Sequence, residues 1–327
     1  MLDSYKTQID RAISELKFPE QPADLYDPIR YMLTFGGKRV RPLLVLLSAS
    51  LFGKKKMAEA MPAAIAIELF HNFTLMHDDI MDDAPLRRGK STVHQKWNNS
   101  VAILAGDNMM VRAYQELSHC GPQLLPELLD ELNQVAREVC EGQQWDMEFE
   151  KREMVSQEEY LSMIRLKTAV LLGTSLKMGA IIGGASKHDA DCLYNFGISV
   201  GIAFQLQDDI LDVYGDAEKF GKQSGGDILS NKKTILTVCA YQSADDAERE
   251  EFSNLVRSET MGDAQKEQGK ISKVKSLYDR LAVFQSATAL QKDYIVRAFD
   301  SLEKMEIEQD RLDNLRNLAH SLLNRTN

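Results

Sequence analysis

The sequence has few prolines and few cysteines, and each shortage argues against a class of structure. Only 8 of the 327 residues are proline, so little interrupts an apolar repeat close to the ~3.6 residues of an α-helix turn. Strand-like alternation is not convincing anywhere. Cys120, Cys140, Cys192 and Cys239 form no C-x-x-C pair, which argues against a disulfide framework and a structural zinc site. We therefore expect long packed helices, with the cysteines as small core residues in a reducing cytosol.

Long apolar runs and excess positive charge are also missing. No stretch reaches the ~18 uninterrupted apolar residues of a membrane span, because the best one, from Ala169 to Ala185, contains Lys177. The segment from Met1 to Asp10 lacks the apolar run of a secretory signal. The net charge, 39 − 49 = −10, disfavours nucleic acid or an anionic membrane surface as the main partner. We expect a soluble cytoplasmic protein without an integral membrane segment.

The helical period predicts where the main segments lie, although length alone does not decide between one large helical domain and two. Asp27-Pro28 has the form of a helix start. Pro42 opens an apolar helix, and Pro85 ends the helix that carries the first acidic cluster. The expected helices cover about 2–16, 42–51, 58–84, 100–118, 123–150, 156–183, 188–214 and most of 234–327.

Two acidic clusters, D-D-I-M-D and D-D-I-L-D, follow apolar stretches with helical spacing. The pairs Asp78 with Asp82 and Asp208 with Asp212 lie about 40° apart around a helix and roughly 6 Å along it. Like charges so placed repel unless a cation lies between them. Carboxylates suit Mg²⁺, which shares its shell with water and substrate phosphates. Facing each other, the clusters would form a cage for a diphosphate; the alternative is a solvated acidic helix face.

Basic segments accompany these clusters. In G-G-K-R-V-R-P, residues 36–42, glycines beside cations allow a close approach to a phosphate, although a solvated turn is an equal alternative. Arg87 to Lys90 forms a basic loop after the first cluster. Lys167 falls within a helix, where it either faces the metal cage or is exposed. Glycines from Gly215 to Gly226, interleaved with lysines, predict either a mobile lid or a plain connector.

Together these motifs resemble a trans-isoprenyl diphosphate synthase of the polyprenyl synthetase family. The matching pieces occur in family order: G-G-K-R-V-R-P (36–42), H-N-F-T-L-M-H-D-D-I-M-D (71–82), R-R-G (87–89), K-T (167–168), F-Q-L-Q-D-D-I-L-D (204–212) and G-K (221–222). Six motifs in order make the resemblance specific, with one departure at Gln223, where the family often has proline. The resemblance implies one polyprenyl synthetase domain over residues 1–327, all-α, with helices around a deep central cavity, usually as a homodimer.

The resemblance also implies the reaction and its residues. A prenyltransferase of this family condenses isopentenyl diphosphate with dimethylallyl, geranyl or farnesyl diphosphate, giving here farnesyl or geranylgeranyl diphosphate. Three Mg²⁺ ions with substrate bound would be held by the aspartates, namely Asp78, Asp79, Asp82, Asp208, Asp209 and Asp212. The allylic diphosphate would be bound by Arg87, Lys167, Lys222 and Lys232, and isopentenyl diphosphate by Lys38, Arg41, His71 and Arg88.

Two further roles follow from the resemblance. Thr168 and Gln205 would turn their oxygens toward the allylic cation, and we count them with Lys167 as catalytic residues. Phe73, followed by Thr74, would close the bottom of the chain-length pocket and favour a short product. An ordinary core phenylalanine is the alternative, because Phe73 lies about 140° around the helix from Asp78.

Rival functions share parts of this pattern. A terpene cyclase has the same fold and the first acidic cluster, but it usually carries a mixed Asn/Ser/Glu or Asp/Thr/Glu motif in place of the second. A non-catalytic partner subunit tends to lose one cluster or the basic turn, and a longer-chain polyprenyl diphosphate synthase differs in its pocket. This sequence keeps both clusters and the basic turn. No Ser-His-Asp or Cys-His constellation occurs in the matched segments, as expected for chemistry without a protein nucleophile.

Overall fold

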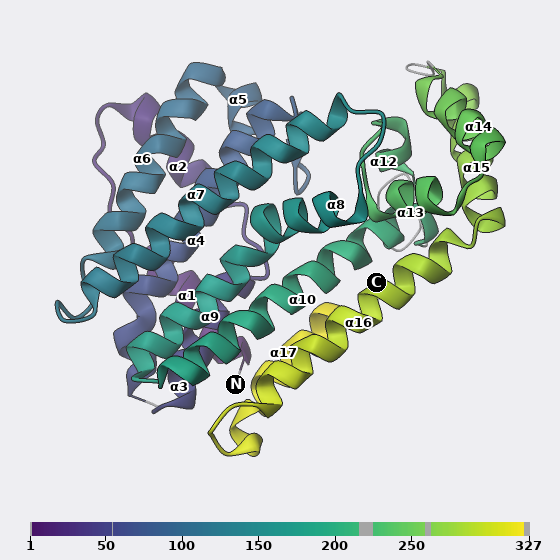
Figure 1. Cartoon of the computed structure of the whole chain (residues 1–327). Coiled ribbons are helices and arrows are strands. Elements are labelled where there is room, and N and C mark those ends of the chain that lie inside the picture. Colours follow the sequence, from purple (N-terminus) through teal and green to yellow (C-terminus); the bar gives the residue numbers. More distant parts are fainter. Residues whose placement is uncertain (1, 54, 216–224, 259–262, 324–327) are drawn as a thin grey trace. The chain divides into compact units, whose positions relative to one another are not determined.

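The computed structural model describes residues 2–53, 55–215, 225–258 and 263–323, almost entirely as helices (Figure 1). It divides into two compact units, each built from several stretches of chain. The first comprises residues 1–133, 174–194 and 306–314, and the second residues 134–173, 195–305 and 315–327. The predicted all-α class is confirmed. The single domain over residues 1–327 stays a prediction.

The elements are distributed between the two units as follows. The first unit contains α1 (Leu2–Ser14), α2 (Ala23–Leu33), α3 (Val40–Leu51), α4 (Lys56–Met81), β1 (Leu86–Arg87), β2 (Lys90–Ser91), α5 (Val93–Lys96), α6 (Asn99–Leu117) and η2 (Gln309–Leu312). The second contains α8 (Gln157–Ile164), η1 (Arg165–Ala169), α12 (Gly226–Leu229), α13 (Ile235–Ser243), α14 (Asp246–Arg257), α15 (Ala264–Arg280) and α16 (Val283–Glu303). Residues of both units occur in α7 (Leu125–Glu150), α9 (Val170–Gly183), α10 (Lys187–Tyr214) and α17 (Asp313–Leu323).

Helix α4 is the centre of the first unit. It packs against α3 and α6, and its buried residues run almost without a break from Ala63 to Phe70. A helix that is apolar on nearly every side belongs inside a protein. The α9 portion of this unit approaches α3 closely, since a Cβ on Gly179 would lie 2.2 Å from the Val45 carbonyl oxygen. This packing fixes the end of α4 that carries the first acidic cluster.

The second unit is organised around α10 and α13. On α10, Ile202, Leu206, Ile210 and Val213 form one buried stripe, with the spacing expected of an amphipathic helix. Helix α13 is buried from Ile235 to Tyr241, and it packs against α8, α15 and α16 (Figure 1). The second acidic cluster lies on α10 beside this core.

A local sequence signal explains the start of α8, and the structure differs from two sequence predictions. Ser156 begins α8 with a capping box formed with Glu159, as the S-x-x-E pattern favours. The predicted start at Asp27-Pro28 is wrong, because α2 begins earlier and includes Pro28; a single proline removes only one backbone donor. Residues 87–90, expected as a loop, form part of the β1–β2 hairpin. The predicted lid falls mainly on residues 216–224, outside the described residues.

One helical run, Gln157–Gly183, has the length and composition to cross a membrane. Within its most apolar window, however, 78% of the residues are buried inside the structure. Such burial is typical of a core helix, because a membrane-spanning helix presents apolar side chains to lipid.

Candidate active site

The first acidic cluster ends α4. Asp82 follows the last helical residue, and its amide donates to the Asp78 carbonyl at 2.9 Å, so the two residues have the predicted helical spacing. The Asp78 side chain is half-buried and Asp82 is exposed. The carboxyl end of a helix carries partial negative charge, which makes adjacent carboxylates unfavourable unless a cation joins them. The helical spacing of Asp78 and Asp82 therefore agrees with the one on which the predicted cation site was based.

Asp79 points in a different direction and binds Arg87. It is 1% exposed; the Arg87 Nε donates to its Oδ1 and Oδ2 at 2.8 and 2.9 Å, and Nη2 lies 2.7 Å from Oδ1. Arg87 lies in β1, which is paired with β2 through a turn formed by Arg88 and Gly89, both with positive φ, as tight hairpins require. The buried Asp79 carboxylate therefore fixes the direction of the Arg87 side chain.

The glycine-rich turn before α3 meets the hairpin and α4. Arg88 Nη1 donates to the Gly36 carbonyl, and a Cβ on Gly37 would lie 2.4 Å from Arg88 Nη1. Glycine at residue 37 thus leaves the space that Arg88 occupies. Arg41 Nη1 lies 3.0 Å from the His71 Nε2. The structure brings together three of the residues predicted to hold isopentenyl diphosphate, and Lys38 is exposed on the same turn.

This group of residues is short of negative charge. Burial lowers the pKa of the Arg41 guanidinium to about 10, with Arg88 adding to the fall and Glu68 opposing it. Burial, followed by the charge of Arg41 and the other arginines, holds the pKa of His71 well below its usual value. The Arg41 Nε is a buried donor without a hydrogen-bond partner among the described residues. A buried orphan donor beside other cations is what an anion would satisfy.

Arg39 has a different role from its neighbours in the turn. It is 6% exposed, forms an ion pair with Glu68 and donates from Nε to Asp10 Oδ1 at 3.0 Å. Its φ of 52° is uncommon for a residue with a side chain. Arg39 thus holds the turn from inside, paired with two carboxylates.

The second acidic cluster lies on α10 in the second unit. Asp208 and Asp212 are half-buried, and Asp212 Oδ2 accepts from the Asp227 amide at 3.0 Å. Asp209 is 4% exposed and accepts from Tyr160 Oη at 2.5 Å and from the Ile235 amide at 3.0 Å. Burial raises the pKa of Asp209 to about 6, against the lowering effect of these donors. Asp209 is tied to α8 and α13.

Lys167 and Thr168 lie in η1, a π-helical turn inside the long α8–α9 run. Such turns are rare and occur frequently at functional sites; the sequence analysis expected a regular helix here. The Lys167 Nζ lies 2.5 Å from Asp146 Oδ2 on α7. Helix α7 approaches η1 through Gly142, whose Cβ, if present, would lie 2.3 Å from the Lys167 amide nitrogen.

Thr168, Gln205 and Asp209 form a hydrogen-bonded row. The Gln205 Nε2 donates to Asp209 Oδ1 at 3.0 Å, and its Oε1 accepts from Thr168 Oγ1 at 3.4 Å. The amide orientation follows from this network, because only its nitrogen can donate to the carboxylate. The Thr168 proton is thereby directed at Gln205, and lone pairs on the Thr168 oxygen are left for another partner.

These side chains line one pocket of about 130 Å³ in the second unit. The predicted residues Lys167, Thr168, Gln205, Asp209 and Lys232 all take part. The other lining residues are Asp146, Tyr160, Met163, Ile164, Asp227, Lys233 and Thr234. The pocket therefore combines ammonium groups, carboxylates and uncharged oxygens.

Comparison with known proteins decides the family. Residues 22–273 match the model of the family described as polyprenyl synthetase. This chain belongs to the polyprenyl synthetase family. A geranylgeranyl diphosphate synthase of Methanosarcina mazei is 42% identical over 238 residues, 72% of this chain and 73% of its own. A geranylgeranyl pyrophosphate synthase of Geoglobus acetivorans is 38% identical over 320 residues, 97% of this chain and 96% of its own. A crystal structure of a geranylgeranyl pyrophosphate synthase has a TM-score of 0.94 at 40% identity, with 99% of each chain covered.

The resemblance inferred from the motifs is confirmed. This member of the polyprenyl synthetase family is a trans-isoprenyl diphosphate synthase, a prenyltransferase with the all-α isoprenoid synthase fold. The rival functions are not favoured, since the relatives are named as synthases of geranylgeranyl diphosphate.

The predicted metal ligands divide into two kinds. Asp79 and Asp209 give both carboxylate oxygens to protein donors, whereas the two pairs Asp78 with Asp82 and Asp208 with Asp212 are more accessible. Within the described ranges, no three His, Cys, Asp or Glu side chains converge as a complete metal site. Ligands beyond the carboxylates would then have to come from water and substrate, as is usual for Mg²⁺. Lys222, predicted to bind substrate, lies outside the described residues.

The predicted chain-length residues lie just over one turn before the first cluster. The Phe73 ring is half-buried, and its centroid is 5.6 Å from Phe70 and 4.8 Å from His77. His77 is held by the Ile103 carbonyl on α6, 3.1 Å from its Nε2. Thr74 donates to the His71 carbonyl at 2.8 Å. Phe73 is thus held in an aromatic row along α4.

Asp146 and Tyr160 of the pocket, and Gly142 beside it, were not among the predicted site residues. Asp146 and Tyr160 have no distinguishing motif, because a single carboxylate or tyrosine in a helix gives no positional signal. Gly142 could have been found, since glycine inside a helix costs about 1 kcal/mol relative to alanine and usually has a packing or functional reason.

Proposed function

We propose that this chain condenses isopentenyl diphosphate with an allylic diphosphate in the presence of Mg²⁺, forming a short all-trans prenyl diphosphate of geranylgeranyl length. The pocket in the second unit carries the proposal, because it joins cations suited to a diphosphate with uncharged oxygens suited to a carbocation. The allylic C–O bond breaks and its electron pair leaves with diphosphate. The isopentenyl double bond then forms the new C–C bond, and a proton passes to the released diphosphate.

The chain's donors fit Mg²⁺. Asp78 with Asp82, and Asp208 with Asp212, are pairs of hard oxygen donors. The first pair lies at the carboxyl end of α4, where the helix dipole adds negative charge, and the second lies in the last two turns of α10. Two carboxylates supply only part of the six-ligand shell of Mg²⁺, so water and phosphate would complete it. We propose that both serve one allylic diphosphate. Bound Mg²⁺ would neutralise the charge of the leaving diphosphate and so lower the barrier to ionisation.

Three cations of the chain are proposed to bind the same diphosphate. Lys167 and Lys232 line the pocket, and Arg87 is held in a fixed direction by its bidentate pair with Asp79. A guanidinium fixed by one carboxylate still has donors for a phosphate oxygen. We therefore assign Asp79 to positioning Arg87 instead of to metal ligation. Asp209 similarly positions Gln205.

Thr168 and Gln205 are proposed to stabilise the allylic cation. Their oxygens are already oriented by the hydrogen bonds that end at Asp209, so little reorganisation is needed when positive charge develops. The pocket walls formed by Met163 and Ile164 would exclude water that could otherwise trap the cation.

The first unit is proposed to hold isopentenyl diphosphate. Arg41 has a buried Nε donor that finds no partner in the described part of the chain, and His71 and Arg88 lie close to the same turn. A diphosphate there would satisfy the donor and offset the positive charge. Because its pKa is so low, the His71 imidazole is neutral at pH 7 and can donate one hydrogen bond without adding charge.

Product length is proposed to be limited by Phe73. Its ring packs between Phe70 and His77, which would support it as a wall. The names of the two relatives support geranylgeranyl over longer products.

A homodimer in the cytoplasm is also proposed. Helix α6 exposes large apolar side chains, with Ile103 44%, Leu104 60% and Val111 53% exposed, as an association surface would. The cytoplasmic location is supported by the composition of the sequence.

The test is incubation with labelled isopentenyl diphosphate, MgCl₂ and dimethylallyl, geranyl or farnesyl diphosphate in turn, with the products sized by chromatography. We expect geranylgeranyl diphosphate from each starter and no turnover after chelation of the metal. Asp78→Ala and Asp208→Ala should reduce turnover at least about a thousandfold, since the electrostatic term supplies much of the rate enhancement. Wild-type rates in both variants, or cyclised hydrocarbon products, would refute the proposal.

A further inference from the structure

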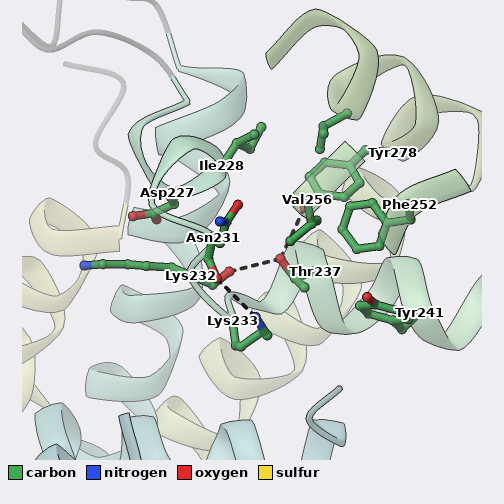
Figure 2. Close-up of a pocket in the computed structure, with 11 residues that line it drawn as sticks. Asp227, Ile228, Asn231, Lys232, Lys233, Thr237, Tyr241, Phe252, Val256 and Tyr278 are labelled. Atoms are coloured by element: carbon green, nitrogen blue, oxygen red, sulfur yellow. Dashed lines mark hydrogen bonds between the residues drawn. The ribbon is translucent and has the colours of Figure 1, made fainter. Parts of the chain in front are cut away.

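A short loop with adjacent lysines, residues 231–233, joins α12 to α13. Asn231 adopts the left-handed backbone conformation with φ 55°, which asparagine tolerates better than most residues. The Lys232 amide donates to the Asp227 carbonyl at 3.0 Å, and both lysines line the pocket of the second unit. In Figure 2 the Lys232 side chain extends away from Thr237 and the aromatic side chains. The direction of these cations therefore depends on what fixes the loop backbone.

Helix α15 supplies a buried ammonium group to this loop. Lys270 is 4% exposed, and its Nζ donates to Asn231 Oδ1 and the Val256 carbonyl at 2.8 Å each and to the Ser258 carbonyl at 3.3 Å. These bonds use all the donors that a lysine has. Val256 and Ser258 lie at the carboxyl end of α14, where helix carbonyls lack partners and the dipole favours a cation.

The same helix reaches the loop a second time through Tyr278. The Tyr278 Oη lies 3.3 Å from Thr237 Oγ1, and Thr237 Oγ1 lies 3.2 Å from the Lys232 carbonyl (Figure 2). A threonine hydroxyl has one proton, which goes to the carbonyl, so Tyr278 is the donor to Thr237. Tyr278 is 2% exposed.

The space enclosed by these groups is too small for a substrate. The cavity that Figure 2 shows, between the loop and the side chains of Thr237, Tyr241 and Tyr278, measures about 20 Å³, close to the smallest volume that holds one water molecule. Tyr278 lines this small cavity, and neither Tyr278 nor Lys270 is among the residues that line the larger pocket; both lie behind the loop that presents its lysines to it.

We propose that Lys270 and Tyr278 are positioning residues, which hold Lys232 in the direction in which it meets the diphosphate. The inference rests on the proposed function, because it assigns Lys232 to the allylic diphosphate. Lys270 fixes the Asn231 side chain, and Tyr278 fixes the Lys232 carbonyl through Thr237. Loss of either contact lets the Lys232 side chain leave the direction in which it meets the diphosphate.

The experiment compares full-length wild type with Lys270→Met and Tyr278→Phe. Matched controls are Lys273→Met, an exposed lysine on the same helix, and Tyr241→Phe, whose hydroxyl faces Ser253 instead of the loop. With MgCl₂ present, Lys270→Met should raise the KM for farnesyl diphosphate about tenfold, the effect of losing a charged hydrogen bond, and Tyr278→Phe about threefold. The KM for isopentenyl diphosphate and kcat should stay within about twofold, as should every parameter of the controls.

Two further measurements separate positioning from general damage. Lys270→Met should add little to Lys232→Ala, because residues that act through one another are not additive. Calorimetric binding of inorganic diphosphate with MgCl₂ should weaken by the same factor as the KM changes, and Lys270→Arg should recover part of it.

The outcomes distinguish the inference from the function on which it rests. A wild type without turnover refutes the proposed function. If the wild type is active, either of two results refutes the inference alone. In the first, Lys270→Met raises both KM values equally or raises neither. In the second, Lys270→Met adds its full effect to that of Lys232→Ala. If Lys270→Met does not fold, the test uses Tyr278→Phe and Asn231→Gly. Glycine at position 231 keeps the left-handed backbone conformation and removes the side-chain acceptor of Lys270. Unchanged KM values in both variants overturn the inference.

Discussion

Gly142 allows α7 to touch the backbone of the π-helical turn, and replacing it by alanine tests this contact. The added Cβ would lie 2.3 Å from the Lys167 amide nitrogen and 2.7 Å from the Leu166 carbonyl carbon. Both are backbone atoms, which cannot rotate away as a side chain would. Helix α7 and η1 must therefore move apart, carrying Lys167 with them. Gly269, on α15, is the control, because a Cβ there meets nothing within 4 Å.

The two substitutions should have opposite effects on the free energy of unfolding. In a helix interior, alanine is about 1 kcal/mol better than glycine, so Gly269→Ala should stabilise by about that amount. Overpacking costs about 1–3 kcal/mol. At Gly142 the contacts are with backbone, which places the cost near about 3 kcal/mol and leaves a net loss of about 2 kcal/mol after the helix gain. The two variants should differ by about 3 kcal/mol.

Urea unfolding followed by circular dichroism measures this difference, and turnover measures its consequence. Gly142→Ala should lower kcat/KM at least about tenfold, because a displacement of catalytic groups by about 1 Å can cost far more than that, while Gly269→Ala should leave it unchanged. If both substitutions shift stability in the same direction, or if Gly142→Ala is as active as wild type, the close approach of α7 to η1 is refuted.

Three other perturbations follow from the first unit. Arg39→Met should lower the free energy of unfolding by about 3–5 kcal/mol, because it leaves the Glu68 carboxylate buried without its cation. Asp10, the other partner of Arg39, has a side chain that is 38% exposed, so Asp10→Asn should cost under about 1 kcal/mol. Equal losses of the two variants in urea unfolding would contradict this. The pKa of His71 is well below its usual 6.5, so its contribution to stability is complete above pH 6.5 and is lost as the pH falls toward the depressed pKa. His71→Gln should therefore flatten the fall in Tm between pH 7 and pH 5. The same slope in both proteins would argue against a depressed pKa. Phe73→Ala should lengthen the product by at least one isoprene unit on reversed-phase chromatography; the same product would show that Phe73 is not the wall.

Much of the fold and part of the site could be predicted from local rules. The 3.6-residue period located the long helices because an apolar face has to be buried over many turns. The aspartate spacing identified the pairs Asp78 with Asp82 and Asp208 with Asp212, since helix geometry relates residues four apart without any tertiary information. The same geometry could have separated Asp79 from the pair formed by Asp78 and Asp82, because each residue turns the helix by about 100° and so points Asp79 in another direction.

The remaining features depend on partners distant in the sequence. Arg39 is one of three cations in a short turn, and only the position of Glu68 on α4 decides that it points inward. Lys270 carries no motif, because its role comes from the carboxyl end of α14 and from Asn231. Contacts of this kind are set by tertiary packing, which local sequence patterns do not encode.

The π-helical turn from Arg165 to Ala169 makes the length of this segment a functional parameter. Deleting one amino acid there would convert the turn into ordinary α-helix, with every backbone bond intact, yet it would swing the preceding residues by about 100° relative to the following ones. The shortened polypeptide would gain regular geometry and lose the juxtaposition of ammonium and hydroxyl that the irregular turn creates. An alignment gap at this point would accordingly mark a homologue whose chemistry has changed, even where every acidic motif survives.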